Sequence, residues 1–165
     1  MHEVAKDAGV AIGTLYRYFP SKTHLFTAVM ADSVESFDRQ VREWPAGTGS
    51  VEEEVADVLT GASRELLRRP ALAVAMLQSS NAAHAAAVPD VGRIDRMFRD
   101  LVLRVLGIDE PTATDLAMVR LLLQLWYGAL QAGLNGRVSV PDVEADIRLG
   151  CSLLLATRSN GETGR

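Results

Sequence analysis

The chain has 165 residues, of which 48% are hydrophobic and 23% charged, and its formal net charge at pH 7 is −4. This composition is ordinary for a soluble globular protein, with room for one domain or for a small domain fused to a larger one. The single cysteine, Cys151, excludes an internal disulfide, and the apolar stretches are too short to span a membrane. No secretory signal is visible, so we expect a cytoplasmic protein.

Charge is distributed unevenly along the chain. Residues 1–26 carry Lys6, Arg17 and Lys22 against two acidic residues, so this end is mildly basic and the remainder is acidic. Phosphate contacts depend on local cations rather than on the net charge of the protein. An acidic protein with such an end can therefore still bind DNA.

The N-terminal pattern predicts two short helices followed by a long one. We expect helices over 2–8 and 12–18, separated by a turn at Gly9. The long helix then begins with Ser21 as its N-cap, and apolar residues at three-four spacing continue it to Trp44. At 1.5 Å per residue it would reach about 35 Å, which is long enough to join two domains.

The rest of the chain also has a helical period, with no alternating strand pattern, so we expect an all-α fold. A capping box formed by Ser50 and Glu53 predicts the start of the next helix. We expect helices over 50–69, 70–86, 89–107, 112–134 and 141–157, followed by a disordered tail over 159–165.

The helix expected over 12–18 has two distinct faces when Phe19 is included. Ile12, Leu15 and Phe19 fall within an arc of about 60° and predict a buried stripe. The other side is formed by Gly13, Thr14, Arg17 and Tyr18, with Tyr16 at its margin, and it offers a hydroxyl, a guanidinium and phenols. Such groups can contact base edges and phosphates in a DNA major groove, although the tyrosines could instead be half-buried core residues.

The residues that precede this helix complete a helix-turn-helix. Val4, Ala5 and Ala8 face inward from the first helix, and Ala5 is small where two helices cross closely. Gly9 can adopt the left-handed conformation that the turn requires. Lys22, in the first turn of the following helix, lies where free N–H groups also favour phosphate.

Residues 4–26, VAKDAGVAIGTLYRYFPSKTHLF, resemble the DNA-binding signature of TetR-type transcriptional regulators, in which a Gly-Thr-Leu-Tyr recognition helix is followed by Tyr-Phe-x-Ser-Lys. The resemblance implies a double-stranded DNA operator and a homodimer. It also implies which residues contact the DNA: Thr14, Tyr16, Arg17, Tyr18 and Lys22, with Gly13 at the closest approach. The segments VAIGTLYRYFPSKTHLF and WYGAL are similar to actinobacterial repressors of sterol catabolism, which implies a large apolar acid or its coenzyme A thioester as the effector.

The resemblance further implies a division of the chain into residues 1–26 for DNA binding and residues 27–158 for ligand binding and dimerisation. In this family the middle helices enclose the effector. Bulky apolar guests suit Met and aromatic side chains, so we expect the pocket to be lined by Met76, Leu77, Asn81, His84, Met97, Phe98, Met118 and Trp126. The last two long helices pair with those of a second subunit, and the expected interface residues are Tyr127, Leu130, Leu134 and Leu153. Packing in the chain's own core is the alternative for each of these residues.

One departure from the family pattern concerns the N-terminus. Members begin with about forty further residues, including a helix that packs on the helix-turn-helix, whereas this sequence starts inside the second helix. Without that cover, Val4, Leu15 and Phe19 would be partly uncovered. The true start lies upstream, the sequence is truncated, or something else covers this face. A ligand-binding helical dimer that no longer binds DNA is therefore the alternative function.

No residue set indicates catalysis or metal binding. His2, His24 and His84 are far apart in sequence and have no second ligand at metal-binding spacing. Cys151 lies among leucines, as a small buried hydrophobe does. We find no Ser-His-Asp set, paired carboxylates or glycine-rich phosphate loop, so we expect no enzyme activity, cofactor or metal.

Overall fold

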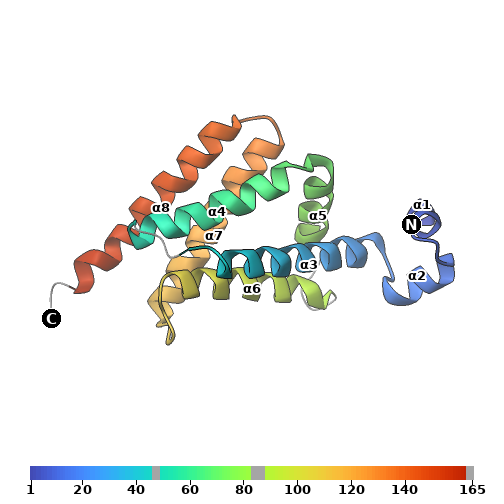
Figure 1. The fold of residues 1–165 in the computed structure, drawn as a ribbon, viewed down its shortest axis with the longest axis horizontal. Helices are drawn as coiled ribbons and strands as arrows, with labels where there is room; N and C mark the ends of the chain where they lie inside the picture. Colours follow the sequence, from blue (N-terminus) through green and yellow to red (C-terminus); the bar gives the residue numbers. More distant parts are fainter. Residues whose placement is uncertain (46–48, 83–87, 163–165) are drawn as a thin grey trace.

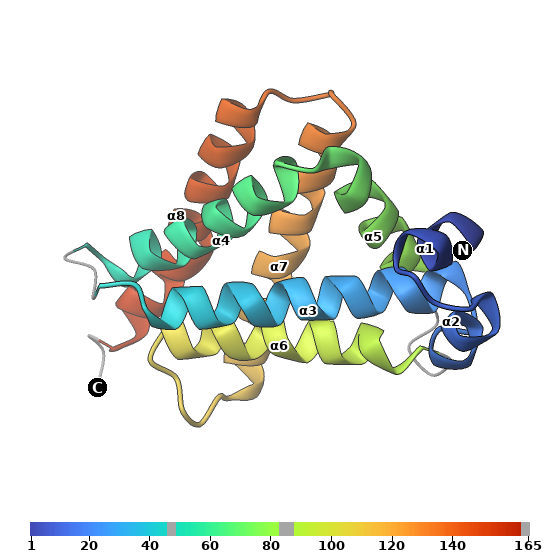
Figure 2. The ribbon, with the colours of Figure 1, turned by 45° about the vertical axis from the view of Figure 1, so that its right-hand side comes forward.

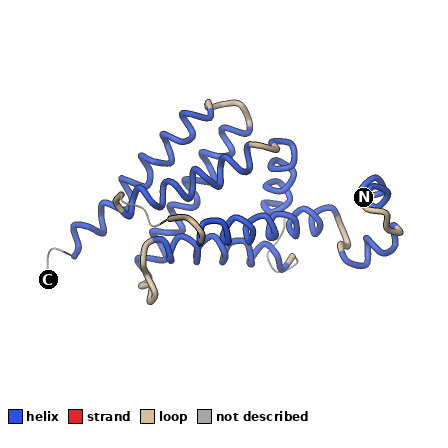
Figure 3. Tube along the Cα trace, in the orientation of Figure 1, coloured by secondary structure: helices blue, strands red, loops and turns tan. Residues whose placement is uncertain are grey.

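A computed structural model describes residues 1–45, 49–82 and 88–162, and within these ranges the regular secondary structure is entirely helical (Figure 3). The helices are α1 (His2–Asp7), α2 (Ile12–Tyr18), α3 (Lys22–Arg42), α4 (Val51–Leu67), α5 (Pro70–Ala82), α6 (Pro89–Val105), α7 (Ala113–Leu134) and α8 (Val140–Glu162). The all-α fold expected from the sequence is confirmed.

The helices form two unequal parts (Figure 1). The short helices α1 and α2 stand at one end of the molecule, and α3 leads from them along the body. Figure 2 shows α6 lying beside α3, with α4 and α5 above this pair. The last two helices, α7 and α8, pack on each other, and α7 also contacts α6 while α8 contacts α4. We refer to α1 and α2 as the head and to α3–α8 as the body.

Several helix starts follow the capping residues that the sequence indicated. The Ser21 hydroxyl accepts a hydrogen bond from the amide of His24 at the start of α3. At the start of α4, Ser50 Oγ accepts from the Glu53 amide at 3.3 Å and Glu53 Oε2 accepts from the Ser50 amide at 3.0 Å, which is the expected capping box. Because these side chains satisfy amides that have no partner within the helix, they fix where each helix begins.

Two helix ends differ from the sequence expectation. The α3 helix ends at Arg42 rather than Trp44. The amides of Glu43 and Trp44 donate to carbonyls three residues earlier, so the chain leaves the α-helical pattern in a tighter final turn. The α8 helix continues to Glu162, beyond the expected end at residue 157, and residues 163–165 of the expected tail lie outside the described residues. No proline follows Pro141 to interrupt α8, and a lone glycine at 161 weakens a helix without ending it.

The body is held together by one apolar core to which α3–α8 all contribute. Its centre includes Leu59 of α4, Val102 of α6, Leu122 of α7 and Ile147 of α8, all of which are fully buried. The head contributes little to burial, with Ala5 and Leu15 as its buried apolar residues. None of the helices in the described ranges is both long and apolar enough to cross a membrane.

Candidate DNA-binding helix and effector cavity

The turn between α1 and α2 depends on a left-handed glycine. Gly9 has φ = 67°, a conformation that costs side-chain-bearing residues energy. The amide of Val10 donates to the carbonyl of Ala5 at 2.9 Å, which closes the end of α1. The chain thereby turns so that Ala5 and Leu15 pack inside the head.

The outward face of α2 carries the polar residues that the helical wheel placed there. Leu15 is buried, whereas Gly13, Thr14 and Arg17 are exposed. Tyr16 is 45% exposed and Tyr18 is 67% exposed, so neither is a core residue of this chain. The helix therefore presents hydroxyl, phenol and guanidinium groups to solvent on one side.

Nothing inside the chain requires a glycine at position 13. A Cβ atom at this position would meet nothing within 4 Å, and its φ is not positive, in contrast to Gly9. A glycine inside a helix costs about 1 kcal/mol relative to alanine. The missing side chain is therefore explained better by something outside the chain that approaches the α2 backbone.

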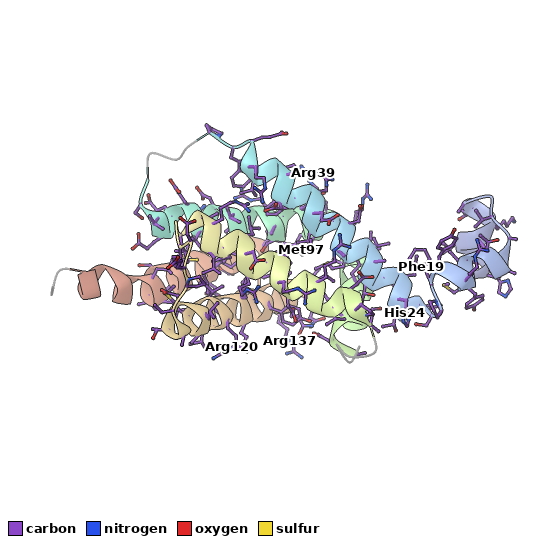
Figure 4. The ribbon with its side chains drawn as sticks, turned by 90° about the horizontal axis from the view of Figure 1, so that it is seen from below. Phe19, His24, Arg39, Met97, Arg120 and Arg137 are labelled. Atoms are coloured by element: carbon purple, nitrogen blue, oxygen red, sulfur yellow. The ribbon has the colours of Figure 1, made fainter. Side chains whose placement is uncertain are left out.

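Arg17 and Tyr18 form a cation–π pair on this surface, with the guanidinium carbon 5.1 Å from the ring centroid. Lys22 is exposed at the first position of α3. His24 turns back, and its Nδ1 lies 2.8 Å from Ser21 Oγ at the junction of α2 and α3 (Figure 4). The ring thus helps hold the start of α3, which leaves Arg17 and Lys22 as the outward cations of this junction.

Part of the apolar surface of the head is open. Val4 and Val10 are both exposed, and Phe19 is half-buried. Leu15, which we expected to be partly uncovered, is buried instead, because α1 and α2 enclose it between them. The two short helices therefore keep the central residue of the motif covered.

A cavity of about 760 Å³ lies among α3, α5, α6 and α7 in the body. Its volume is in the range of small-molecule sites. It is lined by Met30, Leu77, Ser80, Asn81, Val91, Ile94, Asp95, Arg96, Phe98, Arg99, Leu116, Val119, Arg120, Leu123, Gln124, Trp126 and Tyr127.

An aromatic pair forms part of the cavity wall. The rings of Phe98 and Trp126 lie 4.8 Å apart between centroids. The Trp126 indole N–H donates to the Leu59 carbonyl at 3.0 Å and to Ser63 Oγ at 2.9 Å, so the ring is fixed in its orientation. A buried indole with its N–H satisfied gives a rigid apolar wall.

Three arginines, Arg96, Arg99 and Arg120, also line the cavity, against one carboxylate, Asp95. Arg93, three residues before Arg96 on α6, pairs with Glu35 of α3 instead. The cavity thus combines an apolar wall with a net positive lining, which favours an apolar anion as its guest.

Only some of the residues expected to form the pocket line the cavity in the structure. Leu77, Asn81, Phe98 and Trp126 line the cavity. The three methionines do not line it: Met76 and Met118 are buried in the core and Met97 packs against it. His84 lies outside the described residues. Methionine is a good gap filler in ordinary cores, which is where these side chains are found.

Of the residues expected at a subunit interface, some are exposed and others lie in the chain's own core or cavity. Leu153 is 64% exposed on α8, one turn after Leu149, which is 58% exposed. Leu130 is fully buried within its own chain, and Leu134 packs against the same core. Tyr127 lines the cavity. The outward apolar surface of the last two helices is therefore formed by Leu149 and Leu153, together with Leu121 of α7.

A second hollow, of about 500 Å³, lies between the start of α4 and α8. It brings Glu52 and Glu53 near Arg148, which already pairs with Asp57 at 2.7 Å. Among the described residues no three His, Cys, Asp or Glu side chains gather as a metal site. Cys151 is buried, and burial raises the pKa of its thiol to about 11, so it is a poor nucleophile.

Ion pairs connect α3 to α6, the helix that forms much of the cavity wall. Asp38 accepts from Arg104 of α6 at 2.5 Å and from Arg42 at 2.9 Å, and Glu35 pairs with Arg93. Burial opposes ionisation of Asp38, but the hydrogen bonds from Arg104 and Arg42 outweigh it, so the pKa of Asp38 lies below its ordinary value. The carboxylate is therefore held ionised between the two helices.

A helix-turn-helix with an exposed polar face, joined through a long helix to a separate all-α body, defines a DNA-binding regulator. Comparison with known proteins agrees. The family model "Bacterial regulatory proteins, tetR family" matches residues 1–29, and the model "Tetracyclin repressor-like, C-terminal domain" matches residues 48–154. The chain therefore belongs to the TetR family. Its relatives in this family include named transcriptional repressors, which are regulators and not enzymes.

Individual relatives support this assignment. The chain is 35% identical over 159 residues to the HTH-type transcriptional repressor KstR of Rhodococcus jostii, which covers 96% of this chain and 74% of that protein. Identity to KstR of Mycolicibacterium smegmatis is 31% over 157 residues, covering 95% and 77%. A crystal structure of a TetR transcriptional regulator from Rhodococcus sp. RHA1 is 56% identical, with a TM-score of 0.86, and covers 93% of this chain and 82% of that chain.

Proposed function

We propose that the protein is a homodimeric repressor that binds a pseudo-palindromic DNA operator through α2 and is released from it by an apolar anionic effector. The observation that carries the DNA-binding part is the outward face of α2, where Gly13, Thr14, Tyr16, Arg17 and Tyr18 are all exposed. Arg can reach guanine edges or phosphate, and tyrosine hydroxyls can donate to phosphate oxygens. Lys22 adds a phosphate contact at the start of α3.

Dimerisation is supported by the outward leucines of α7 and α8. Leu121, Leu149 and Leu153 are exposed large apolar residues on neighbouring helices, and a second copy of this surface would remove them from water. A Cβ atom at Gly128 of α7 would also meet nothing within 4 Å, which permits close approach of a partner helix. Two-fold symmetry would place the two α2 helices in successive major grooves, about 34–36 Å apart or at a multiple of that distance.

The effector is inferred from the cavity. Its apolar wall suits a bulky hydrocarbon, and Arg96, Arg99 and Arg120 suit a carboxylate or the phosphates of a coenzyme A thioester. A sterol-derived acid or its thioester has both properties. Such a ligand would release the protein from DNA only if it binds better to the conformation that fits the operator less well.

The test is selection of duplexes from a randomised pool, followed by anisotropy titrations over a series of salt concentrations. We expect a palindromic site, affinity that falls steeply with salt, and a loss of about 1–3 kcal/mol in Arg17→Ala. Tyr16→Phe should show a smaller loss. Arg68→Ala, at the exposed C-cap residue of α4, is the matched control and should leave binding unchanged. A folded dimer that binds no duplex at low salt would contradict the proposal and favour a ligand-binding dimer without DNA affinity.

A further inference from the structure

The helices α7 and α8 interlock at two glycines, one on each helix. A Cβ atom added at Gly150 of α8 would lie 2.7 Å from both methyl carbons of Leu125 and 3.3 Å from its Cγ. A Cβ atom at Gly133 of α7 would lie 2.8 Å from Cγ2 of Val143. Carbon atoms in good contact lie about 3.5–4.0 Å apart. Each glycine therefore forms a notch that a branched side chain of the other helix fills.

The two notches together fix how α7 packs on α8. The paired residues run in opposite directions along the two helices, so the pair is antiparallel. The notches are about 12 Å apart along α7, since a helix rises 1.5 Å per residue. Two contacts at this separation determine the crossing angle of the helices as well as their distance. Glycine is less favourable than alanine inside a helix, and the close approach explains why both positions carry it.

The Gly150 notch lies within the outward apolar surface of these two helices. Gly150 follows Leu149 directly and precedes Leu153 by one turn, and both leucines are exposed. On the other helix Leu121, also exposed, lies one turn before Leu125. The antiparallel register brings Leu121 level with Leu153 to within one residue. The three exposed leucines that we propose to face a second copy thus surround this notch.

Gly150 is buried inside its own chain, so a second copy does not reach it. Any influence on association must pass through Leu125, which is half-buried. A methyl group at position 150 would force the helices apart or swing Leu125 aside. Rotation about the Cβ–Cγ bond of Leu125 is not sufficient, because it leaves Cγ at 3.3 Å. Either movement alters the surface formed by the exposed leucines.

We propose that Gly150 is a positioning residue for dimerisation, which sets the spacing of α7 and α8 so that their exposed leucines match those of a second copy. This rests on the proposed homodimer. In a two-fold symmetric interface each surface meets a copy of itself, so an altered spacing is present on both sides of the contact. The Gly133 notch, by contrast, lies about 18 Å from Leu121 along α7 and serves packing within the subunit.

The test compares Gly150→Ala with Gly133→Ala, a matched control that also adds one methyl group to a filled notch. Dissociation constants of the dimer are measured by sedimentation velocity over a dilution series. We expect Gly150→Ala to raise the dissociation constant about tenfold, as overpacking by one methyl group would do. Gly133→Ala should change it by less than about twofold, because its notch is too far from the exposed leucines to couple with them.

A second substitution, Leu125→Ala, tests the route of the effect. Removing the isopropyl group makes room for the methyl group of Gly150→Ala. The dissociation constant of the double variant should therefore return to within about threefold of that of Leu125→Ala alone. Strictly additive losses would show that position 150 does not act through Leu125, which would overturn the positioning role.

The same measurements separate the role of Gly150 from the proposed homodimer. Equal dissociation constants in Gly150→Ala and Gly133→Ala, whether raised or unchanged, would overturn the inference and leave the homodimer standing. A wild-type chain that sediments as a monomer at every concentration would contradict the homodimer, and the role of Gly150 with it.

Discussion

The head and the body of this protein are stabilised in different ways. The head consists of two short helices with Ala5 and Leu15 as its buried apolar residues, whereas six helices of the body share a continuous core. The residues of α2 that we propose for DNA contact have side chains in solvent, so they contribute little to folding. In the body the reverse holds, since cavity residues such as Trp126 are also core residues. Substitutions in the head should therefore change DNA binding with little loss of stability, whereas substitutions at the cavity of the body should change both ligand binding and stability.

The largest expected effect is in the body. Trp126 is 3% exposed and its indole N–H has two acceptors, so Trp126→Ala should lower the free energy of unfolding by about 3–5 kcal/mol. Trp44→Ala is the matched control, because Trp44 is 42% exposed and contacts Phe37 edge-on. Denaturant titration should show a much smaller loss there, and equal losses would contradict the assignment of Trp126 to the core.

In the head, Gly13→Ala should change stability and DNA affinity in opposite directions. An alanine has space at this position and favours the helix, so unfolding should require up to about 1 kcal/mol more. The added methyl group would separate the α2 backbone from DNA, and we expect affinity to fall about tenfold, as when one good contact is lost. Chemical unfolding and operator anisotropy measure the two effects.

Thr114→Ala controls for helix propensity, since Thr114 is an exposed residue of α7 in the body. It should add stability without altering DNA affinity. Unchanged operator binding in Gly13→Ala would show that the backbone at residue 13 does not approach the DNA.

The smallest expected effect concerns the connection between α3 and α6. The pKa of Asp38 is lowered in the folded state, so its ion pairs stabilise the protein above the unfolded pKa of about 4 and this contribution is lost as pH falls through the folded value. Asp38→Asn should therefore cost at most about 1 kcal/mol at pH 7, because Arg104 and Arg42 are partly exposed. The difference from wild type should shrink when unfolding is measured below about pH 4.

Asp146→Asn, at an exposed residue of α8, should show no such dependence on pH. A constant difference between Asp38→Asn and wild type across this range would mean that the ionised carboxylate does not stabilise the contact of α3 with α6.

The head was the more predictable part, because its signal is a contrast between adjacent residues. In α2 the aliphatic residues Ile12 and Leu15 are three residues apart and the positions between and after them are not aliphatic, so the buried side of Leu15 and the open side of Arg17 follow from the helical period. The capping residues Ser21 and Ser50 were equally predictable, since a serine hydroxyl at a helix start accepts a hydrogen bond from an amide of the first turn.

The body was less predictable where that contrast is missing. On α7 leucines occur on several sides of the helix, so the sequence could not distinguish Leu130 of the core from the outward Leu121. Arginines three residues apart drift by about 60° around a helix at each step, and this drift separates Arg93, which contacts α3, from Arg99, which lines the cavity. Which apolar residues line a cavity depends on how far apart the helices lie, which no single helix specifies.

The length of α3 has a mechanical consequence for the proposed dimer. Its 21 residues span about 31 Å, with α2 attached at one end and Met30 lining the cavity about two-fifths of the way along. A tilt of about 5° about the far end would move α2 by about 3 Å, and opposite movements in two subunits would change their separation by more than one base-pair step of about 3.4 Å. An effector would then need only a small angular wedge at the cavity to put the two recognition helices out of phase with the DNA.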